Sequence, residues 1–201
     1  YGGVKLKLGA PTAEQDLHLL RLVRQEVGTS FPIMADYNQA LTVPEAIRRI
    51  RTIDDEGLVW IEEPTSADNA QGHASIASQV RTPVQLGENW SSLSEASLSL
   101  RLQASAYAMP DLVKIGGVSA WLDAACLANA SGVPVSSHAF TEICAHLLPA
   151  VASPHWVEHV GLADSIFMDA VLPRNGTFTA SGKPGLGLEW NEVEIAKCLV
   201  H

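Results

Sequence analysis

The sequence predicts an α/β barrel of parallel strands, and two observations support this fold class. Short apolar runs alternate with helix-like segments along the chain, and each run is followed by an ionisable residue. The runs are only a few residues long and are bounded by turn-forming residues, as buried parallel strands are. Seven segments have this form: residues 4–8, 32–35, 58–61, 83–86, 106–109, 133–136 and 156–157.

The segments between these runs carry the signals of helix ends. Three of them begin with capping-box spacing, in which a hydroxyl and a side chain three residues later satisfy free backbone N–H groups. The pairs are Thr12 with Gln15, Thr42 with Glu45, and Ser92 with Glu95. Glycines that can end a helix lie after three segments, at Gly28, Gly57 and Gly132. The alternation predicts repeated βαβ units in one parallel sheet.

Seven parallel strands could form an open doubly wound sheet or a barrel. The dinucleotide fingerprint of the open sheet is absent, because Gly116-Gly117 lacks the later glycine. The ionisable residues favour the barrel, since the carboxyl ends of all barrel strands face one shared cavity. In chain order they are Lys5 and Lys7, Asp36, Glu62, Glu88, Asp111, His138 and Glu158.

Composition excludes several functional classes. The chain has 201 residues and a net charge of −9 without a cluster of Lys or Arg, which argues against a nucleic-acid partner. No apolar run approaches the roughly 20 residues of a membrane span. Cys126, Cys144 and Cys198 lie far apart in the sequence, so neither a zinc site nor a disulfide framework is indicated. We expect reduced thiols in a cytoplasmic protein.

Three carboxylates follow three successive strands, at Asp36, Glu62 and Glu88. Carboxylates on neighbouring strand ends repel one another unless a cation lies between them. Oxygen ligands favour a hard ion, and Mg²⁺ binds few carboxylates and leaves positions for water and substrate. The trio therefore predicts a magnesium site at the barrel mouth.

Two further pairs have the chemistry of proton transfer. Lys5 and Lys7 are two apart on a strand and share a face, and two adjacent ammonium groups lower a pKa, which suits one of them to act as a base. Asp111 follows the strand before that of His138, and a carboxylate beside an imidazole orients it and raises its basicity. We expect the two pairs to lie opposite each other across the cavity.

These residues lie in distinctive contexts: VKLKLG (4–9), DYNQ (36–39), WIEEPT (60–65), GENW (87–90), MPD (109–111), KIGGV (114–118), SSH (136–138), HWVE (155–158) and PGLGLEW (184–190). In this order they resemble the mandelate racemase family of the enolase superfamily over nearly the whole chain. Lys-x-Lys alone also fits related racemases and cycloisomerases, and the His–Asp pair separates these from the family. The resemblance implies that residues 1–201 form a TIM-type (β/α)7β catalytic barrel domain. It also implies that the first strand and the N-terminal capping domain are absent, which leaves an open edge beside Lys5 and Lys7.

The resemblance also implies a role for each proton-transfer residue. Lys7 is the base for the S enantiomer of a 2-hydroxy acid, and His138, supported by Asp111, is the base for the R enantiomer. Lys5 binds the substrate carboxylate and lowers the pKa of Lys7. A protonated Glu158 donates a hydrogen bond to the same carboxylate. The implied Mg²⁺ ligands are Asp36, Glu62 and Glu88, and Asn38 is expected to contact the polar end of the substrate.

The function that these roles indicate is magnesium-dependent racemisation of a mandelate-like 2-hydroxy acid through an enediolate. Small residues at Ala139 and Val160, where the family has larger aliphatics, imply a reshaped apolar pocket. An acid-sugar dehydratase is the alternative, with His138 as the acid that releases a 3-hydroxyl. A non-catalytic barrel is a third hypothesis, and the intact site residues argue against it. We expect a homo-oligomer that binds a small carboxylate.

Overall fold

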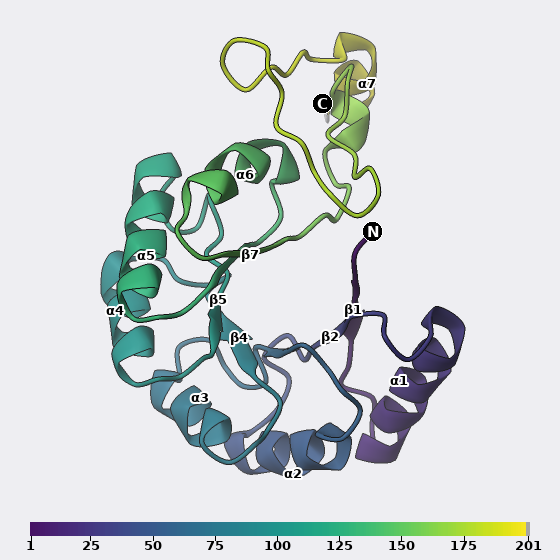
Figure 1. The fold of residues 1–201 in the computed structure, drawn as a ribbon, viewed down its shortest axis with the longest axis vertical. Coiled ribbons are helices and arrows are strands. Elements are labelled where there is room, and N and C mark those ends of the chain that lie inside the picture. Colours follow the sequence, from purple (N-terminus) through teal and green to yellow (C-terminus); the bar gives the residue numbers. More distant parts are fainter. Residues whose placement is uncertain (200–201) are drawn as a thin grey trace.

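The structure is a computed structural model that describes residues 1–199. Its centre is a seven-stranded parallel sheet with strand order β1-β2-β3-β4-β5-β6-β7, which curves into a half-barrel with helices on its outer side (Figure 1). The strands are β1 (Val4–Lys7), β2 (Ile33–Asp36), β3 (Ile61–Glu62), β4 (Val84–Leu86), β5 (Tyr107–Ala108), β6 (Val135–Ser137) and β7 (Pro154–Val157). The sheet confirms the predicted parallel α/β architecture.

One helix follows each of the first six strands, and a last helix lies near the C-terminus. The helices are α1 (Ala13–Val27), α2 (Val43–Ile53), α3 (Ala70–Ala77), α4 (Leu93–Arg101), α5 (Val118–Ala130), α6 (Thr141–Leu147) and α7 (Glu192–Cys198). Two short 3₁₀ turns add Leu148–Ala150 and Asp164–Ile166. No helix among the described residues is both long and apolar enough to cross a membrane.

Two of the three predicted capping signals are present in the structure. Thr12 forms a complete capping box at the start of α1, and the Ser92 hydroxyl accepts the backbone N–H of Glu95 at the start of α4. Thr42 precedes α2 but its side chain makes no capping hydrogen bond. The Glu45 side chain, which would complete the capping box by accepting the Thr42 backbone N–H, pairs instead with Arg48 and Arg49.

The helix stops agree with the glycine signals at two of three places. Gly28 is the C-cap of α1 with φ of 88°, and Gly132 follows the C-cap of α5 with φ of 73°. The helix α2 already ends at Ile53, and Gly57 lies in the loop that leads to β3.

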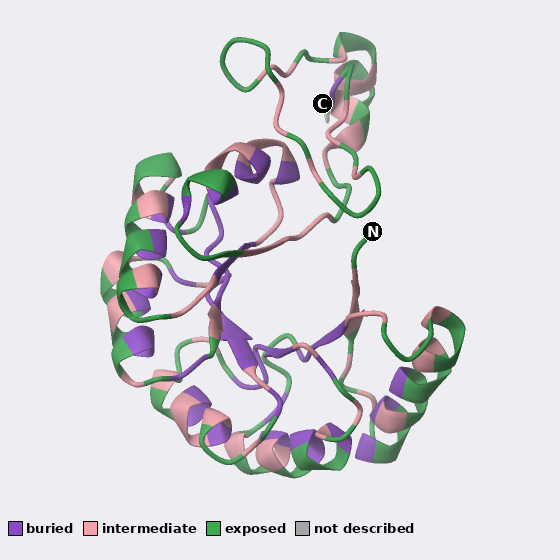
Figure 2. Ribbon diagram, viewed as in Figure 1, coloured by how far each residue is buried: buried purple, intermediate pink, exposed green. Residues whose placement is uncertain are grey.

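The core lies between the outer face of the sheet and the inner faces of the helices, where Figure 2 shows the buried segments. Alternate strand residues point outward to this core, and the residues between them point into the barrel. The outward layer includes Ile33, Ala35, Ile61, Val84 and Leu86, and the helices contribute Leu20, Ile50, Ile53, Ile76, Leu100 and Trp121. This packing holds the strands so that their carboxyl ends converge on one mouth.

The sheet has two edges within residues 1–199, because β1 pairs with β2 and β7 pairs with β6. The edge expected beside Lys5 and Lys7 is therefore present. The N-terminal residues reach across to the C-terminal part of the chain: the Tyr1 ring stacks on His159 with ring centroids 5.9 Å apart, and Gly2 lies against Gly176 (Figure 1).

All three cysteines are free, as predicted, and they differ in exposure. Burial raises the pKa of the Cys144 thiol to about 12, whereas Cys126 and Cys198 are exposed. We expect iodoacetamide at pH 8 to alkylate Cys126 and Cys198 in the native protein and Cys144 only after unfolding, because the thiolate is the reactive form. Peptide mass spectrometry measures this, and rapid native labelling of Cys144 would contradict the structure.

Candidate active site

The three predicted metal ligands converge at the barrel mouth. Asp36 and Glu62 are the last residues of β2 and β3 and are direct partners in the parallel ladder, and Glu88 follows β4 by two residues. All three are buried, and their nearest oxygen atoms lie within 4.8 Å of one another. Burial raises the pKa of Glu62 despite its pairing with Lys5. A cation between these oxygens offsets the free-energy cost of burying three negative charges together, so the trio fits Mg²⁺.

Lys5 joins the trio to the opposite edge of the sheet. Its ammonium group lies 2.5 Å from Glu62 Oε1, 2.5 Å from Glu158 Oε1 and 3.7 Å from Asp36 Oδ2. Burial lowers the pKa of Lys5, but the charges of Glu62 and Glu158 outweigh it and raise that pKa above its ordinary value. The carboxylates that surround Lys5 are the cause of this raised pKa, and the predicted effect of Lys5 on Lys7 stays a prediction.

Lys7 lies above Lys5 on the same face of β1 and donates a hydrogen bond to Asp36. Its side chain is 62% exposed, which contrasts with 17% for Lys5. Lys7 is thus the more accessible of the two ammonium groups, and the two lysines have different surroundings.

The His138–Asp111 pair forms as predicted. His138 Nδ1 lies 2.6 Å from Asp111 Oδ2, and the other oxygen of Asp111 accepts the backbone N–H groups of Val113 and Lys114 at 2.8 Å each. These bonds hold the carboxylate and, through it, the imidazole ring. The free Nε2 is directed toward the trio, 3.3 Å from Glu88 Oε2. Lys7 and His138 therefore contact opposite ends of the carboxylate trio, at Asp36 and Glu88 respectively.

The surroundings of Glu158 lower its pKa. Burial would raise its pKa, but Lys5 and the backbone N–H of Ala139, which donates to Oε2 at 2.9 Å, bring the pKa below its ordinary value. The lowered pKa runs against the expected protonated Glu158, whose protonation beside a bound substrate stays a prediction. The cause is a pairing with Lys5 across the barrel that the sequence does not reveal.

Asn38 contacts the site through its backbone N–H group. Its N–H donates to Asp36 Oδ1 at 2.7 Å, and the residue is exposed at the mouth. The next residue also lies at the mouth, where the Gln39 side chain accepts the backbone N–H of Ala67. A substrate contact by the Asn38 side chain remains a prediction.

Two residues that support the trio, Trp60 and Asn89, were missed by the sequence reasoning. The Trp60 indole donates to Glu62 Oε2 at 3.1 Å, and Asn89 donates to Glu88 Oε1 at 3.1 Å and to both oxygens of Glu63 at 2.8 Å. These partners orient the ligands from outside. The only signal for them is their position in the strand-end motifs, next to or two residues from a carboxylate.

Left-handed backbone conformations gather at the same mouth. Of the seven non-glycine residues with positive φ in the described part of the chain, five lie just after Asp36, Glu62 or His138. The residues concerned are Asn38 (43°), Gln39 (64°), Glu63 (35°), Ala139 (45°) and Phe140 (44°). Such conformations are costly for side chains with a Cβ and cluster at functional sites, where the surrounding structure enforces them.

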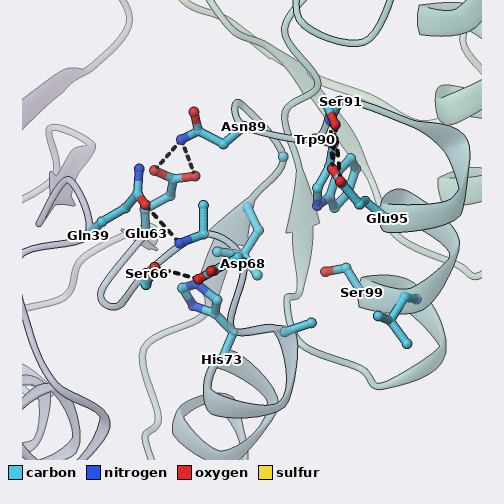
Figure 3. A pocket seen from close by; sticks show the side chains of 15 residues that line it. Gln39, Glu63, Ser66, Asp68, His73, Asn89, Trp90, Ser91, Glu95 and Ser99 are labelled. Atoms are coloured by element: carbon cyan, nitrogen blue, oxygen red, sulfur yellow. Dashed lines mark hydrogen bonds between the residues drawn. The ribbon is translucent and has the colours of Figure 1, made fainter.

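A separate cavity of about 430 Å³ lies beside the site, between α3 and α4 (Figure 3). Its lining includes Glu63 and Asn89, and it also includes His73, Trp90 and Ser99. None of the predicted catalytic, substrate-binding or metal-binding residues lines this cavity, although some of their sequence neighbours, such as Glu63 and Asn89, do. The candidate active site is therefore the carboxylate trio with its flanking bases, within the barrel mouth.

The comparisons with known proteins agree with this geometry. A family model described as enolase C-terminal domain-like matches residues 1–194. L-talarate/galactarate dehydratase from Salmonella typhimurium is 35% identical over 95% of this chain and 48% of its own length. The 3,6-anhydro-α-L-galactonate cycloisomerase of Streptomyces coelicolor is 30% identical over 94% of this chain and 52% of its own. The chain thus spans about half the length of these relatives.

Solved structures of enolase-superfamily proteins are also similar to this chain. An enolase from Bradyrhizobium in complex with magnesium and mandelic acid has a TM-score of 0.94 and 38% identity, covering 98% of this chain and 54% of that one. L-Talarate dehydratase from Polaromonas, in complex with Mg and L-glucarate, has a TM-score of 0.88 and 36% identity, covering 96% of this chain and 55% of that one. Magnesium accompanies both, in keeping with the acidic trio found here. By its fold, its strand-end carboxylates and its similarity to these proteins, the chain belongs to the enolase C-terminal domain-like family of the enolase superfamily.

Proposed function

We propose that the protein is a magnesium-dependent acid-sugar dehydratase, which removes water from a polyhydroxy carboxylate. The observation that carries the proposal is the placement of two proton-transfer groups, Lys7 and His138, at opposite ends of the carboxylate trio. Dehydration needs one group to take the α-proton and another to protonate the leaving hydroxyl. The similarity to talarate/galactarate dehydratase favours this reaction over racemisation.

The trio Asp36, Glu62 and Glu88 would hold the ion. When bound, Mg²⁺ supplies positive charge that stabilises the negative charge arising on the substrate carboxylate. Lys5, whose ammonium lies between Glu62 and Glu158, is placed to bind the same carboxylate. Preorganised charges of this kind act where charge develops in the transition state.

Lys7 would act as the base at the α-carbon. The C–H bond breaks, its proton goes to a neutral Lys7 amine, and its electron pair moves into the carboxylate. The electron pair then returns to form a double bond between the α- and β-carbons as the β C–O bond breaks. Protonated His138 gives its proton to the departing hydroxyl, which leaves as water, and the resulting enol becomes a 2-keto-3-deoxy acid. Asp111 keeps His138 in position for this transfer.

The proposal is tested on the complete gene product that carries this sequence, with Mg²⁺ and a panel of acid sugars and 2-hydroxy acids. We expect keto-acid product, detected with semicarbazide, from at least one diacid sugar such as talarate, galactarate or glucarate. Mandelate is the comparison substrate. No keto acid from any acid sugar, together with a change in the optical rotation of mandelate, would reject dehydration.

Racemisation of a 2-hydroxy acid is the second candidate. One observation favours it: the similar Bradyrhizobium structure contains mandelic acid. The same two bases would then act on opposite faces of the α-carbon, with one removing the proton and the other returning it. The polarimetric arm of the panel distinguishes the two reactions. A homo-oligomeric state and a cytoplasmic location remain predictions.

A further inference from the structure

A buried charge network lies outside the barrel, between α1 and α2. Asp16 and Arg49 form its centre, with Arg49 Nη1 3.1 Å from Asp16 Oδ2, and both side chains are less than one-tenth exposed. The Arg49 Nε also pairs with Glu45 at 2.6 Å. A buried ion pair has a large desolvation cost and stabilises a fold little compared with apolar residues of the same size. Its presence here calls for a role other than stability.

The network binds the loop that immediately follows Lys7. Asp16 Oδ1 accepts the backbone N–H groups of Gly9 and Ala10 at 3.0 and 2.9 Å. Arg49 donates to the carbonyl oxygen of Ala10 at 2.7 Å and to that of Pro11 at 3.1 Å. The loop that ends β1 is thus bound on both its donor and its acceptor groups.

The same network reaches the strand that carries the first metal ligand. Tyr37 directly follows Asp36, and its buried hydroxyl donates to Asp16 Oδ2 at 3.3 Å. One carboxylate, Asp16, therefore binds the backbone beyond Lys7 and the side chain beyond Asp36. Lys7 and Asp36 are themselves hydrogen-bonded and are partners in the ladder between β1 and β2.

Lys7 needs such support more than the other proposed catalytic side chains. It is the last residue of β1, and its side chain is mostly exposed. A long, exposed side chain at a strand end is poorly placed for proton transfer unless the backbone around it is held. His138, by comparison, is held by Asp111.

We propose that Asp16 and Arg49 are positioning residues that hold Lys7 against Asp36. This inference rests on the proposed function for its meaning in catalysis. Its structural content, the placement of Lys7, can be measured without a substrate.

The test uses competitive acetylation of lysines in the complete gene product, with EDTA present, followed by mass spectrometry. The Lys7 to Lys114 labelling ratio is measured, because Lys114 is similarly placed at the mouth and pairs with Asn89 and Glu88. Arg49→Lys keeps the charge but cannot reproduce the planar fork that binds two carbonyls and two carboxylates. We expect the ratio to rise about threefold or more as Lys7 leaves Asp36.

Two further variants separate positioning from general loss of stability. Tyr37→Phe removes only the hydroxyl that links Asp16 to β2, and we expect a smaller rise in the ratio. Asp54→Asn is the matched control, because Asp54 binds Arg81 and Thr82 in a similar way before β4, at the opposite end of the barrel. Its labelling ratio should equal that of the wild type even where its melting temperature falls.

Activity gives the second readout. In Arg49→Lys we expect kcat to fall on the order of 10²-fold, as small displacements of a catalytic group do, with KM changed less than about threefold. Asp54→Asn should retain kcat. An unchanged labelling ratio in folded Arg49→Lys overturns the inference. A wild type that lacks turnover on every substrate of the panel rejects the proposed function instead, and the labelling ratio still decides whether the network positions Lys7.

Discussion

Replacing His138 with asparagine is expected to lower keto-acid formation from an acid sugar by about 10²–10⁴-fold while α-proton exchange continues. Asparagine has similar size and polarity but cannot protonate the leaving hydroxyl. Lys7 contacts the other end of the trio and does not touch His138 in the structure, so it should still remove the α-proton. Exchange is measured by NMR in D₂O, and the product is measured in parallel.

The matched control is His18→Asn, because His18 is exposed on α1, which covers the outer side of the sheet (Figure 1). Its activity should equal that of the wild type. If the protein instead racemises a 2-hydroxy acid, His138→Asn should retain exchange from the S enantiomer and lose exchange from the R enantiomer. Equal loss of exchange from all substrates would contradict the assignment of Lys7 and His138 as two independent bases.

Replacing Glu62 with glutamine should remove most of the stabilisation that Mg²⁺ provides. A ligand that binds only the folded state at 100 times its Kd stabilises it by about 2.7 kcal/mol. We expect a Mg²⁺-dependent rise in Tm for the wild type, because the buried carboxylates lie close enough to share one ion. Glutamine removes one of the three charges and also a hydrogen-bond acceptor of Trp60 or Lys5.

The measurement is a thermal melt with EDTA and with increasing Mg²⁺, and it does not depend on knowing the substrate. Glu26→Gln is the control, since Glu26 is exposed on α1 and makes no contact with the trio. Ca²⁺ provides a second comparison, because it prefers more ligands at longer distances. An equal Tm rise in wild type and Glu62→Gln would show that Mg²⁺ binds elsewhere.

The parallel half-barrel and the convergence of its strand ends could be predicted from local patterns. Apolar runs of strand length, helix caps such as that of Thr12, and a carboxylate after each of three runs are all readable from neighbouring residues. Asp36 and Glu62 are paired in the parallel ladder between β2 and β3, so their side chains lie close together because each ends its strand. The same reasoning predicted the contact between Asp111 and His138.

Charge states could not be predicted in this way. The only charged residue near Lys5 in the sequence is another lysine, yet in the structure Lys5 lies between Glu62 and Glu158 and its pKa is raised. Glu158 is 153 residues from Lys5 in the sequence, and their contact depends on the curvature of the sheet. A pKa reflects every charge within a few ångströms, so it depends on positions that only folding sets.

The choice between racemase and dehydratase could not be predicted from the strand-end motifs either. The strand-end motifs hold the groups that both reactions share, and the resemblance to the mandelate racemase family led to racemisation as the first hypothesis. The relatives favour dehydration instead. Substrate choice depends on the loops and surfaces around the mouth, where residues such as Asn38 and Ala139 adopt left-handed conformations that no local motif specifies.

The sequence by itself determined the strand–helix alternation, the carboxylate trio and the pairing of Asp111 with His138, because each depends on spacing along one chain. The tertiary structure decided which charges neutralise one another and what holds Lys7 in place. Asp16 and Arg49 are ordinary polar positions of two helices when read in order, and they meet only because α1 and α2 pack side by side. The strength of a buried ion pair depends on its distance, its burial and its other hydrogen bonds, which are set by packing between distant elements and cannot be read from neighbouring residues.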